Sequence, residues 1–228
     1  MRSAFALAVL VSFSASAQAL KTDDEKSLYA IGYLVGSRSF AAMSLKPNEL
    51  EIVKRGLSDG ASGKKAQVEP ESQMEKINAF AQARSSAGAD KEKVAGREYA
   101  EKAAKEPGAS KLPSGIVYKT LTPGDGPSPA ATDKVKVNYE GRLTNGTVFD
   151  SSYKRGQPAE FGLNQVIKCW TEGVQKMKVG EKARLVCPSD IAYGDHGRPP
   201  QIPPGATLVF KVELLSIGGG TASSAAPK

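Results

Sequence analysis

The sequence is poor in the residues from which most catalytic sites are built. It contains one histidine, His196, and two cysteines, Cys169 and Cys187, among 228 residues. His196 stands in a loop rich in glycine and proline, where no Cys–His pair, metal cluster or Ser–His–Asp set can be assembled around it. The cysteines do not form a CxxC motif, and the glycine-rich stretches lack phosphate-loop spacing. We expect no metal, no cofactor and a solvated His196. If the chain is an enzyme, its reaction needs no strong acid, base or nucleophile.

Long apolar segments and blocks of like charge are also missing. After residue 20, no apolar run is long enough to span a bilayer, so we expect no membrane anchor. The chain has 31 basic and 24 acidic side chains and a net charge of +7, but the basic residues are scattered among the acidic ones. A nucleic-acid partner would favour a clustered basic region, and we therefore expect no nucleic acid.

Residues 1–19 have the pattern of a secretory signal peptide. They combine the basic Arg2, an apolar run over residues 4–13, and the cleavage motif Ala17-Gln18-Ala19. The apolar run is too short and too interrupted for a transmembrane anchor, and no cysteine near the cleavage site offers a point for lipid attachment. We expect cleavage near Ala19 and a soluble mature chain that begins at Leu20. Its compartment would be oxidising, the bacterial periplasm.

Residues 20–106 carry helical patterns. Thr22 and Glu25 form a capping box that predicts a first helix. A second helix is predicted over residues 47–60, and a third segment of helix-forming residues runs over residues 70–106. The third segment has few large apolar residues, so we interpret it as a solvated connecting arm.

The two shorter helices have apolar stripes and no core of their own in which to bury them. The stripes consist of Leu28, Ile31 and Val35 in the first helix and of Leu50, Val53 and Leu57 in the second. In a chain of this size the simple solution is a partner copy, so we predict a homodimer through the N-terminal helices. Docking of the stripes on the C-terminal half of the same chain is the alternative.

After a predicted linker at residues 107–114, the pattern changes from helical to alternating. Apolar residues then alternate with polar ones, at Val135, Val137 and Tyr139 and again at Leu208, Phe210, Val212 and Leu214. Such alternation is typical of half-buried antiparallel strands.

A hairpin and one short helix complete the C-terminal half. Thr144-Asn145-Gly146-Thr147 predicts a tight turn between two strands, and a short helix is plausible around residues 170–177. Residues 115–217 are therefore predicted to form an α+β domain, a curved antiparallel sheet wrapped on a short helix. Residues 218–228, rich in glycine, serine and alanine, are expected to be a flexible tail.

Several motifs in this half resemble those of the FKBP-type peptidyl-prolyl cis/trans isomerases. They are Val137-Asn138-Tyr139-Glu140-Gly141, Val148-Phe149-Asp150-Ser151-Ser152, Gln165-Val166-Ile167 with Trp170, Ile191-Ala192-Tyr193-Gly194, Ile202-Pro203-Pro204 and Thr207-Leu208-Val209-Phe210. They occur in family order over residues 113–217. The N-terminal half is similar to the helical domain of bacterial envelope members, including the macrophage infectivity potentiator type, in which this domain makes a dimer.

The resemblance implies a pocket that binds a proline ring. Its catalytic residues would be Tyr139, Phe149, Asp150, Trp170, Tyr193 and Phe210, and its further substrate-binding residues would be Phe161, Val166, Ile167 and Ile202. In the family's arrangement Trp170 would be the floor of this pocket. Tyr193 would donate a hydrogen bond to a substrate carbonyl, and Asp150 would orient or polarise at the rim.

The chain departs from the family pattern at several positions. Ala159 replaces an aromatic wall residue, and Arg198 and Gln201 change the loop after the Ala-Tyr-Gly motif, which alters the expected peptide preference and the affinity for macrolide inhibitors. Cys169 replaces a glycine and Cys187 an aliphatic residue. Because the family pattern packs this helix on this sheet, a Cys169–Cys187 disulfide is predicted, with two buried thiols as the alternative.

By resemblance, then, the chain is predicted to be a peptidyl-prolyl cis-trans isomerase that accelerates the folding of exported proteins. Its partners would be unfolded or partly folded exported chains with X-Pro bonds, which the helical half would help to hold. The alternative is a chaperone or adaptor whose pocket binds proline without significant turnover.

Overall fold

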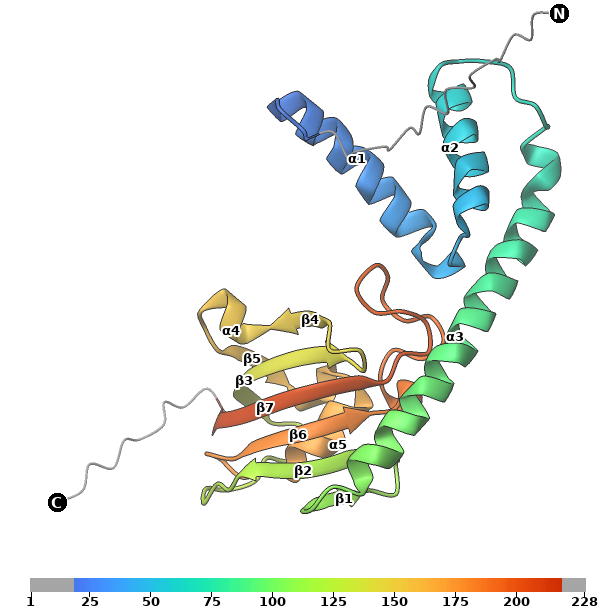
Figure 1. Cartoon of the computed structure of the whole chain (residues 1–228). Helices are drawn as coiled ribbons and strands as arrows, with labels where there is room; N and C mark the ends of the chain where they lie inside the picture. Colours follow the sequence, from blue (N-terminus) through green and yellow to red (C-terminus); the bar gives the residue numbers. More distant parts are fainter. Residues whose placement is uncertain (1–18, 219–228) are drawn as a thin grey trace, which may run out of the picture.

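A computed structural model describes residues 19–218 of the chain; the predicted signal peptide and tail lie almost entirely outside them. A helical part is joined by one long helix to a β-sheet part (Figure 1). The helices are α1 (Asp23–Ser39), α2 (Pro47–Ala61), α3 (Met74–Ala104), α4 (Ser152–Arg155) and α5 (Lys168–Gln175), with 3-10 turns η1 (Ala41–Met43), η2 (Glu71–Gln73), η3 (Leu163–Gln165) and η4 (Ser189–Ile191). The strands are β1 (Ala109–Lys111), β2 (Val117–Thr122), β3 (Lys134–Leu143), β4 (Val148–Ser151), β5 (Ala159–Gly162), β6 (Lys182–Cys187) and β7 (Leu208–Ile217). The predicted α+β fold is confirmed.

The N-terminal helices begin where the sequence signals predict. The Thr22 hydroxyl accepts a hydrogen bond from the Glu25 amide at 3.1 Å, and the Glu25 carboxylate accepts one from the Thr22 amide at 3.0 Å, which forms the capping box of α1. Helix α2 begins at Pro47, whose missing amide hydrogen is not needed in a first turn. Helix α3 is continuous over 31 residues, about 46 Å at 1.5 Å per residue.

The strands form one antiparallel sheet in the order β1-β2-β6-β7-β3-β4, with β5 paired to β3. The two long strands, β3 and β7, pair along nearly their whole length. An Asn-Gly turn joins β3 to β4, as predicted, with Gly146 at φ 88°. The range 107–114, predicted as a linker, contains β1, which pairs with β2 and so extends the sheet at its edge.

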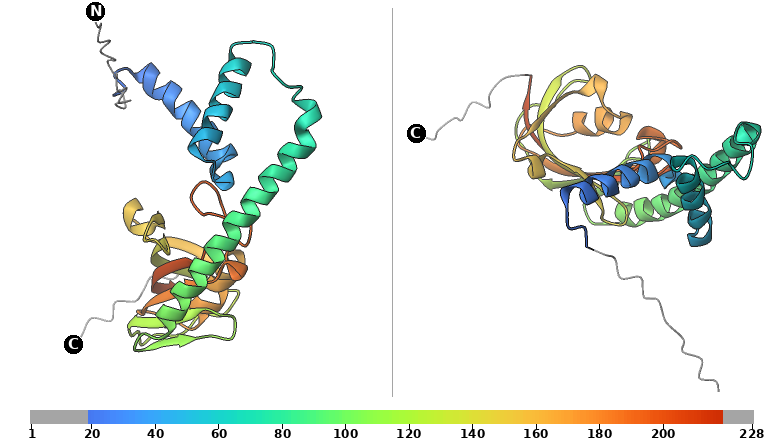
Figure 2. Two further views of the ribbon diagram at one scale, coloured as in Figure 1. Left: turned by 45° about the vertical axis from the view of Figure 1, so that its right-hand side comes forward. Right: turned by 90° about the horizontal axis from the view of Figure 1, so that it is seen from above.

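Both faces of the sheet are covered. Neighbouring residues in a strand point to opposite sides, so each strand contributes side chains to both faces. One face carries Leu185 and Phe210 and packs on α5 in the main core. The other carries Val186 and Val209, which pack with Ala100 and Ala103 of α3. Figure 2 shows the C-terminal part of α3 lying along the sheet.

This packing corrects one expectation. The third helix is not a solvated arm throughout, since Ala89, Gly96, Ala100 and Ala103 are buried. Its buried contact residues are small, and Tyr99, which packs beside them, is only partly buried. The helix therefore approaches the sheet closely without the row of large apolar side chains that normally marks a buried face. At its end, Glu106 accepts a hydrogen bond from Lys119 at 3.0 Å and forms an ion pair with Arg184 at 2.9 Å.

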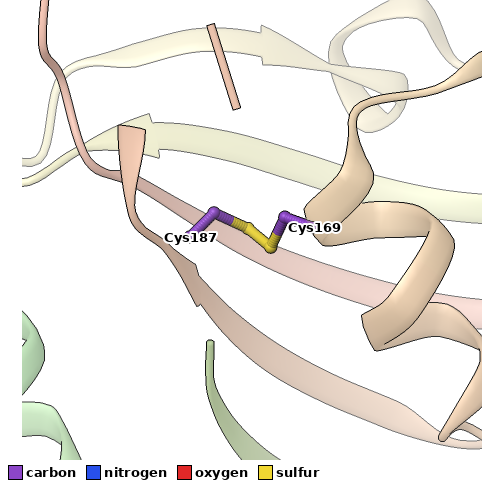
Figure 3. Close-up of a disulfide and its surroundings, with 2 residues drawn as sticks. All are labelled: Cys169 and Cys187. Carbon is purple, nitrogen blue, oxygen red and sulfur yellow. A yellow bond between two sulfur atoms is a disulfide. The ribbon is translucent and has the colours of Figure 1, made fainter. Parts of the chain in front are cut away.

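A disulfide joins the start of α5 to the end of β6 (Figure 3). It links Cys169 and Cys187, both fully buried, with 5.8 Å between their Cα atoms, within the range that disulfides span. Close packing continues along the helix: a Cβ on Gly173 would lie 2.8 Å from a methyl carbon of Leu185.

Among the helices of residues 19–218, none is both long and apolar enough to cross a membrane.

The packing of α3 on the sheet yields a stability prediction. Ala103→Glu places a charged side chain among Val117, Val186 and Val209, and we expect it to lower the free energy of unfolding by about 2–3 kcal/mol. Ala95→Glu, at an exposed position of the same helix, is the control and should change it by less than about 0.5 kcal/mol. Urea unfolding measures both. Equal stability of the two variants would mean that α3 does not rest on the sheet.

Candidate active site

A cavity of about 420 Å³ opens on the core side of the sheet. It lies between β3, β4, β5, the start of α5 and the loop that follows η4. Its lining residues are Tyr139, Phe149, Asp150, Phe161, Gln165, Val166, Ile167, Trp170, Tyr193, Arg198 and Phe210. The structure thus brings together all the predicted site residues except Ile202.

Ile202 lies in an adjoining hollow of about 260 Å³. This hollow shares Phe149, Asp150, Tyr193 and Arg198 with the main cavity, and it adds Gln201 as a further wall residue. The predicted contact residues are therefore split between the larger cavity and its smaller neighbour. His196 lines neither of them and is exposed.

The floor of the cavity is an aromatic cluster centred on Trp170. The indole ring centroid lies 5.2 Å from that of Tyr139, 5.6 Å from that of Phe161 and 5.3 Å from that of Phe210, all edge to face. Such edge-to-face pairs add to the stabilisation from burial alone. The cluster makes an apolar surface whose ring orientations are held by their neighbours.

A glycine allows two of the walls to meet. A Cβ on Gly141 would lie 2.6 Å from the Phe149 ring and 2.9 Å from the Phe210 ring, closer than carbon atoms approach. Those two rings pack edge to face with centroids 5.7 Å apart. The glycine of the predicted Val-Asn-Tyr-Glu-Gly strand is therefore required by the shape of the cavity.

The rim carries a polar network around Asp150. The Tyr139 hydroxyl donates a hydrogen bond to the Asp150 carboxylate, and the Arg155 guanidinium forms an ion pair with the same carboxylate. The Ser151 amide donates a further bond to it at 2.8 Å, and Arg155 donates one to the Tyr139 hydroxyl oxygen at 2.9 Å. The carboxylate is held in place from several sides.

Sequence reasoning missed Arg155. The residue stands at the end of α4, a single turn capped by the Ser151 side chain and closed by Gly156 at φ 71°. That turn folds the guanidinium back over the Tyr139 ring, 5.5 Å from its centroid. In the sequence, Ser151 and Gly156 predict a short helical turn between them. They do not predict the direction in which the Arg155 side chain points.

The network sets the charges at neutral pH. Burial opposes ionisation of Asp150, but hydrogen bonds from Tyr139 and Arg155 and the charge of Arg155 outweigh it, so the pKa of Asp150 is below its usual value. Burial, followed by the hydrogen bond to Asp150, raises the pKa of Tyr139. The network therefore offers a fixed carboxylate and a neutral phenol at neutral pH.

Within residues 19–218, no group of three or more histidine, cysteine or acidic side chains is arranged to hold a metal ion. The cavity is suited to enclosing a small apolar ring beside a polar rim. Its volume falls within the range usual for small-ligand sites.

Two family models match the chain. The model described as FKBP-type peptidyl-prolyl cis-trans isomerase matches residues 126–215, and the model of the domain amino terminal to that isomerase matches residues 24–120. Together they extend over both parts of the structure.

Relatives match most of the chain's length. It is 43% identical over 210 residues to the FKBP-type peptidyl-prolyl cis-trans isomerase FkpA of Aeromonas hydrophila, covering 86% of this chain and 77% of that protein. It is 39% identical over 209 residues to the peptidyl-prolyl cis-trans isomerase Mip of Coxiella burnetii, covering 89% of this chain and 90% of that one. The crystal structure of FkpA from Escherichia coli matches with a TM-score of 0.64 and 38% identity, over 88% of this chain and 99% of that one.

The rim yields a prediction for prolyl-peptide isomerisation. Asp150→Ala and Tyr193→Phe should each lower kcat/KM about tenfold while the fold stays intact, because both side chains line the cavity and neither belongs to the fully buried core. Tenfold corresponds to about 1.4 kcal/mol of transition-state stabilisation. His196→Ala, outside the cavity, is the control and should leave kcat/KM unchanged. Undiminished turnover in the Asp150→Ala, Tyr193→Phe double variant would contradict the assignment.

Proposed function

This chain belongs to the family of FKBP-type peptidyl-prolyl cis-trans isomerases, and on that premise we propose that it isomerises X-Pro bonds by enclosing the prolyl ring in the cavity above Trp170. The activity itself is that of the family. The observation that carries the proposed mechanism is the aromatic floor and walls of the cavity, beside a rim where Asp150 stays ionised and Tyr139 stays neutral near neutral pH.

The barrier to rotation explains why such a cavity suffices. Rotation about the C–N bond costs about 18–20 kcal/mol because amide resonance gives it partial double-bond character. The twisted transition state loses that resonance and much of the charge separation at its carbonyl. Water stabilises the polar planar amide more than an apolar enclosure does, so transfer into the cavity favours the twisted state. No covalent intermediate is needed. This agrees with the sequence, in which no nucleophilic side chain could be paired with the single histidine as its base.

The individual roles follow from position. Trp170 supports the face of the proline ring, and Tyr139, Phe149 and Phe210 surround it. Tyr193 donates a hydrogen bond to a substrate carbonyl, and the Asp150 carboxylate orients the amide from the rim. Arg155 is a positioning residue, since it contacts Asp150 and Tyr139 and does not line the cavity.

Two substitutions of Trp170 test the enclosure. Trp170→Phe keeps an apolar ring, and it loses no hydrogen bond because the buried indole nitrogen has no partner among the described residues; we expect kcat/KM within about threefold of the wild type. Trp170→Ala opens the floor and should cost at least about tenfold in kcat/KM and about 3–5 kcal/mol of stability. Peptide isomerisation and urea unfolding measure the two effects. A folded but inactive Trp170→Phe variant would mean that the indole N–H takes part, against the enclosure mechanism.

The helical half is proposed to pair two copies and to hold clients. On α1 the side chains of Leu28, Tyr29, Ile31 and Tyr33 are each at least 60% exposed, too much apolar surface for a helix that stands free in water. Cβ atoms at Gly32 and Gly36 would meet nothing within 4 Å, which leaves room for a second helix to approach. We assign residues 20–106 to dimerisation and client binding and residues 115–217 to isomerisation.

The location is proposed to be the periplasm. The signal-peptide pattern at residues 1–19 supports export, and the buried Cys169–Cys187 disulfide fits an oxidising compartment. In that compartment uncatalysed X-Pro isomerisation takes tens of seconds or longer and limits folding. Clients would be exported chains whose folding waits on such bonds.

A charged substitution on α1 tests whether assisted refolding depends on the dimer while peptide isomerisation does not. Ile31→Asp should convert a sedimenting dimer to a monomer at micromolar concentration and slow the assisted refolding of a proline-limited protein severalfold, because two linked sites raise the local concentration of a long chain. Turnover of a prolyl tetrapeptide should stay within about twofold. Ser58→Asp, at an exposed polar position of α2, is the control. A wild-type chain that sediments as a monomer would refute the dimer.

A further inference from the structure

The loop between η4 and β7 is a wall of the active site. We call residues 194–207 the flap. On its inner side Arg198, Gln201 and Ile202 line the main cavity or the adjoining hollow. On its outer side the flap lies against the middle of α3, and the views of Figure 1 and Figure 2 agree on this. The flap is thus held between the substrate pocket and the helical part of the chain.

Two glycines set the distance between α3 and the flap. A Cβ on Gly96 of α3 would lie 2.1 Å from the Thr207 hydroxyl oxygen and 2.7 Å from the Thr207 Cβ. A Cβ on Gly205 of the flap would lie 2.3 Å from the Ala89 carbonyl oxygen. Real Cβ atoms do not approach so closely, so the helix and the base of the flap are in contact at both points. Ala89 and Thr207 are buried by this contact.

An ion pair joins α3 to the beginning of the flap, where the Asp195 side chain is 62% exposed. The Lys93 ammonium lies 2.5 Å from the Asp195 carboxylate, with the lysine side chain 26% exposed. Lys93 stands between Ala89 and Gly96 on α3, one turn from each, so all three share one face of the helix. The contact combines close steric fit at two points with one charge pair.

Backbone hydrogen bonds connect the two sides of the flap. Arg198 and Ile202 exchange backbone hydrogen bonds of 2.8 and 3.0 Å, and the Gly205 amide donates to the Gly194 carbonyl at 3.0 Å. These bonds tie the pocket side of the loop to the residues that touch α3. We therefore expect a shift at Gly205 to move Arg198 and Ile202 as well.

We propose that α3 is a positioning element of the isomerase site, with Lys93 and Gly96 as positioning residues that hold the flap at the distance where it contacts the peptide around proline. The inference rests on the proposed use of the pocket. Neither residue touches substrate. Displacing the helix should weaken binding of the peptide more than it slows rotation of the bond above Trp170, so KM should respond more than kcat.

A pair of glycine substitutions tests the steric contact in the full-length protein. Gly96→Ala forces α3 and Thr207 apart, and we expect KM for a prolyl tetrapeptide to rise about five- to tenfold with kcat within twofold. Amide hydrogen exchange at Arg198, Ile202 and Gly205 should become faster. Gly88→Ala is the control: it makes the same change in the same helix, but its Cβ would meet nothing within 4 Å. It should leave KM and flap exchange unchanged.

A charge exchange tests the ion pair without a steric change in the core. Lys93→Glu places a carboxylate against Asp195 and should raise KM about three- to fivefold. Combining it with Asp195→Lys restores an attractive pair and should bring KM back to within twofold of the wild type. A pair that only stabilises the fold would change the free energy of unfolding and leave KM unchanged, so rescue of KM itself is the result that supports a positioning role.

The outcomes separate the proposal from the activity on which it rests. Wild-type KM and flap exchange in both Gly96→Ala and Lys93→Glu would overturn the positioning role while isomerisation itself stands. Faster flap exchange with unchanged KM would also overturn it, since the flap would then move without affecting the site. If Gly96→Ala fails to fold, the charge exchange decides, and absence of rescue counts against the proposal. If the wild-type chain does not isomerise prolyl peptides, the proposed function itself is contradicted.

Discussion

The alternation of side chains along the central strands is the constraint on which the structure depends. In β6, Leu185 faces α5 and Val186 faces α3; in β7, Phe210 faces the pocket and Val209 faces α3. Burying each such side chain contributes about 1.5–3 kcal/mol, and a slip of one residue would exchange the two faces. The same register therefore places the aromatic wall of the site and the seat of the long helix on opposite sides of one sheet.

The side chains that line the cavity are held in place by their neighbours. The aromatic rings about Trp170 are held edge to face, so the cavity keeps its shape without a ligand. The carboxylate at the wall, Asp150, forms an ion pair with Arg155 and is fixed by Tyr139. A carboxylate held in this way fits the proposed mechanism, in which it acts through its position and charge and transfers no proton.

The long helix connects properties that the two halves would otherwise have separately. Its C-terminal third rests on the sheet through Ala100 and Ala103, and its middle touches the flap at Ala89. Beyond the flap it leads to α1 and α2, whose apolar side chains are exposed. One continuous helix therefore connects the exposed apolar side chains of the helical half to the flap beside the cavity.

Much of this protein was determined by patterns that are local in the sequence. The capping box at Thr22, the proline that opens α2, and the period of two through Tyr139 predict their elements because each depends only on neighbours a few residues away. The resemblance to the family predicted ten pocket residues. Nine of them line one cavity in the structure, and the tenth, Ile202, lines the adjoining hollow.

What the tertiary structure alone decided involves small residues and returning turns. Ala100, Ala103 and Gly96 carry no apolar signal in the sequence, and their burial depends on how closely another element can approach. Arg155 belongs to the site because one turn of helix points it back at Asp150, and Gly205 matters because Ala89 lies against it. Whether two elements approach closely depends on the shapes of both contact surfaces. The residues of one surface therefore do not predict which residues of another element will pack against them.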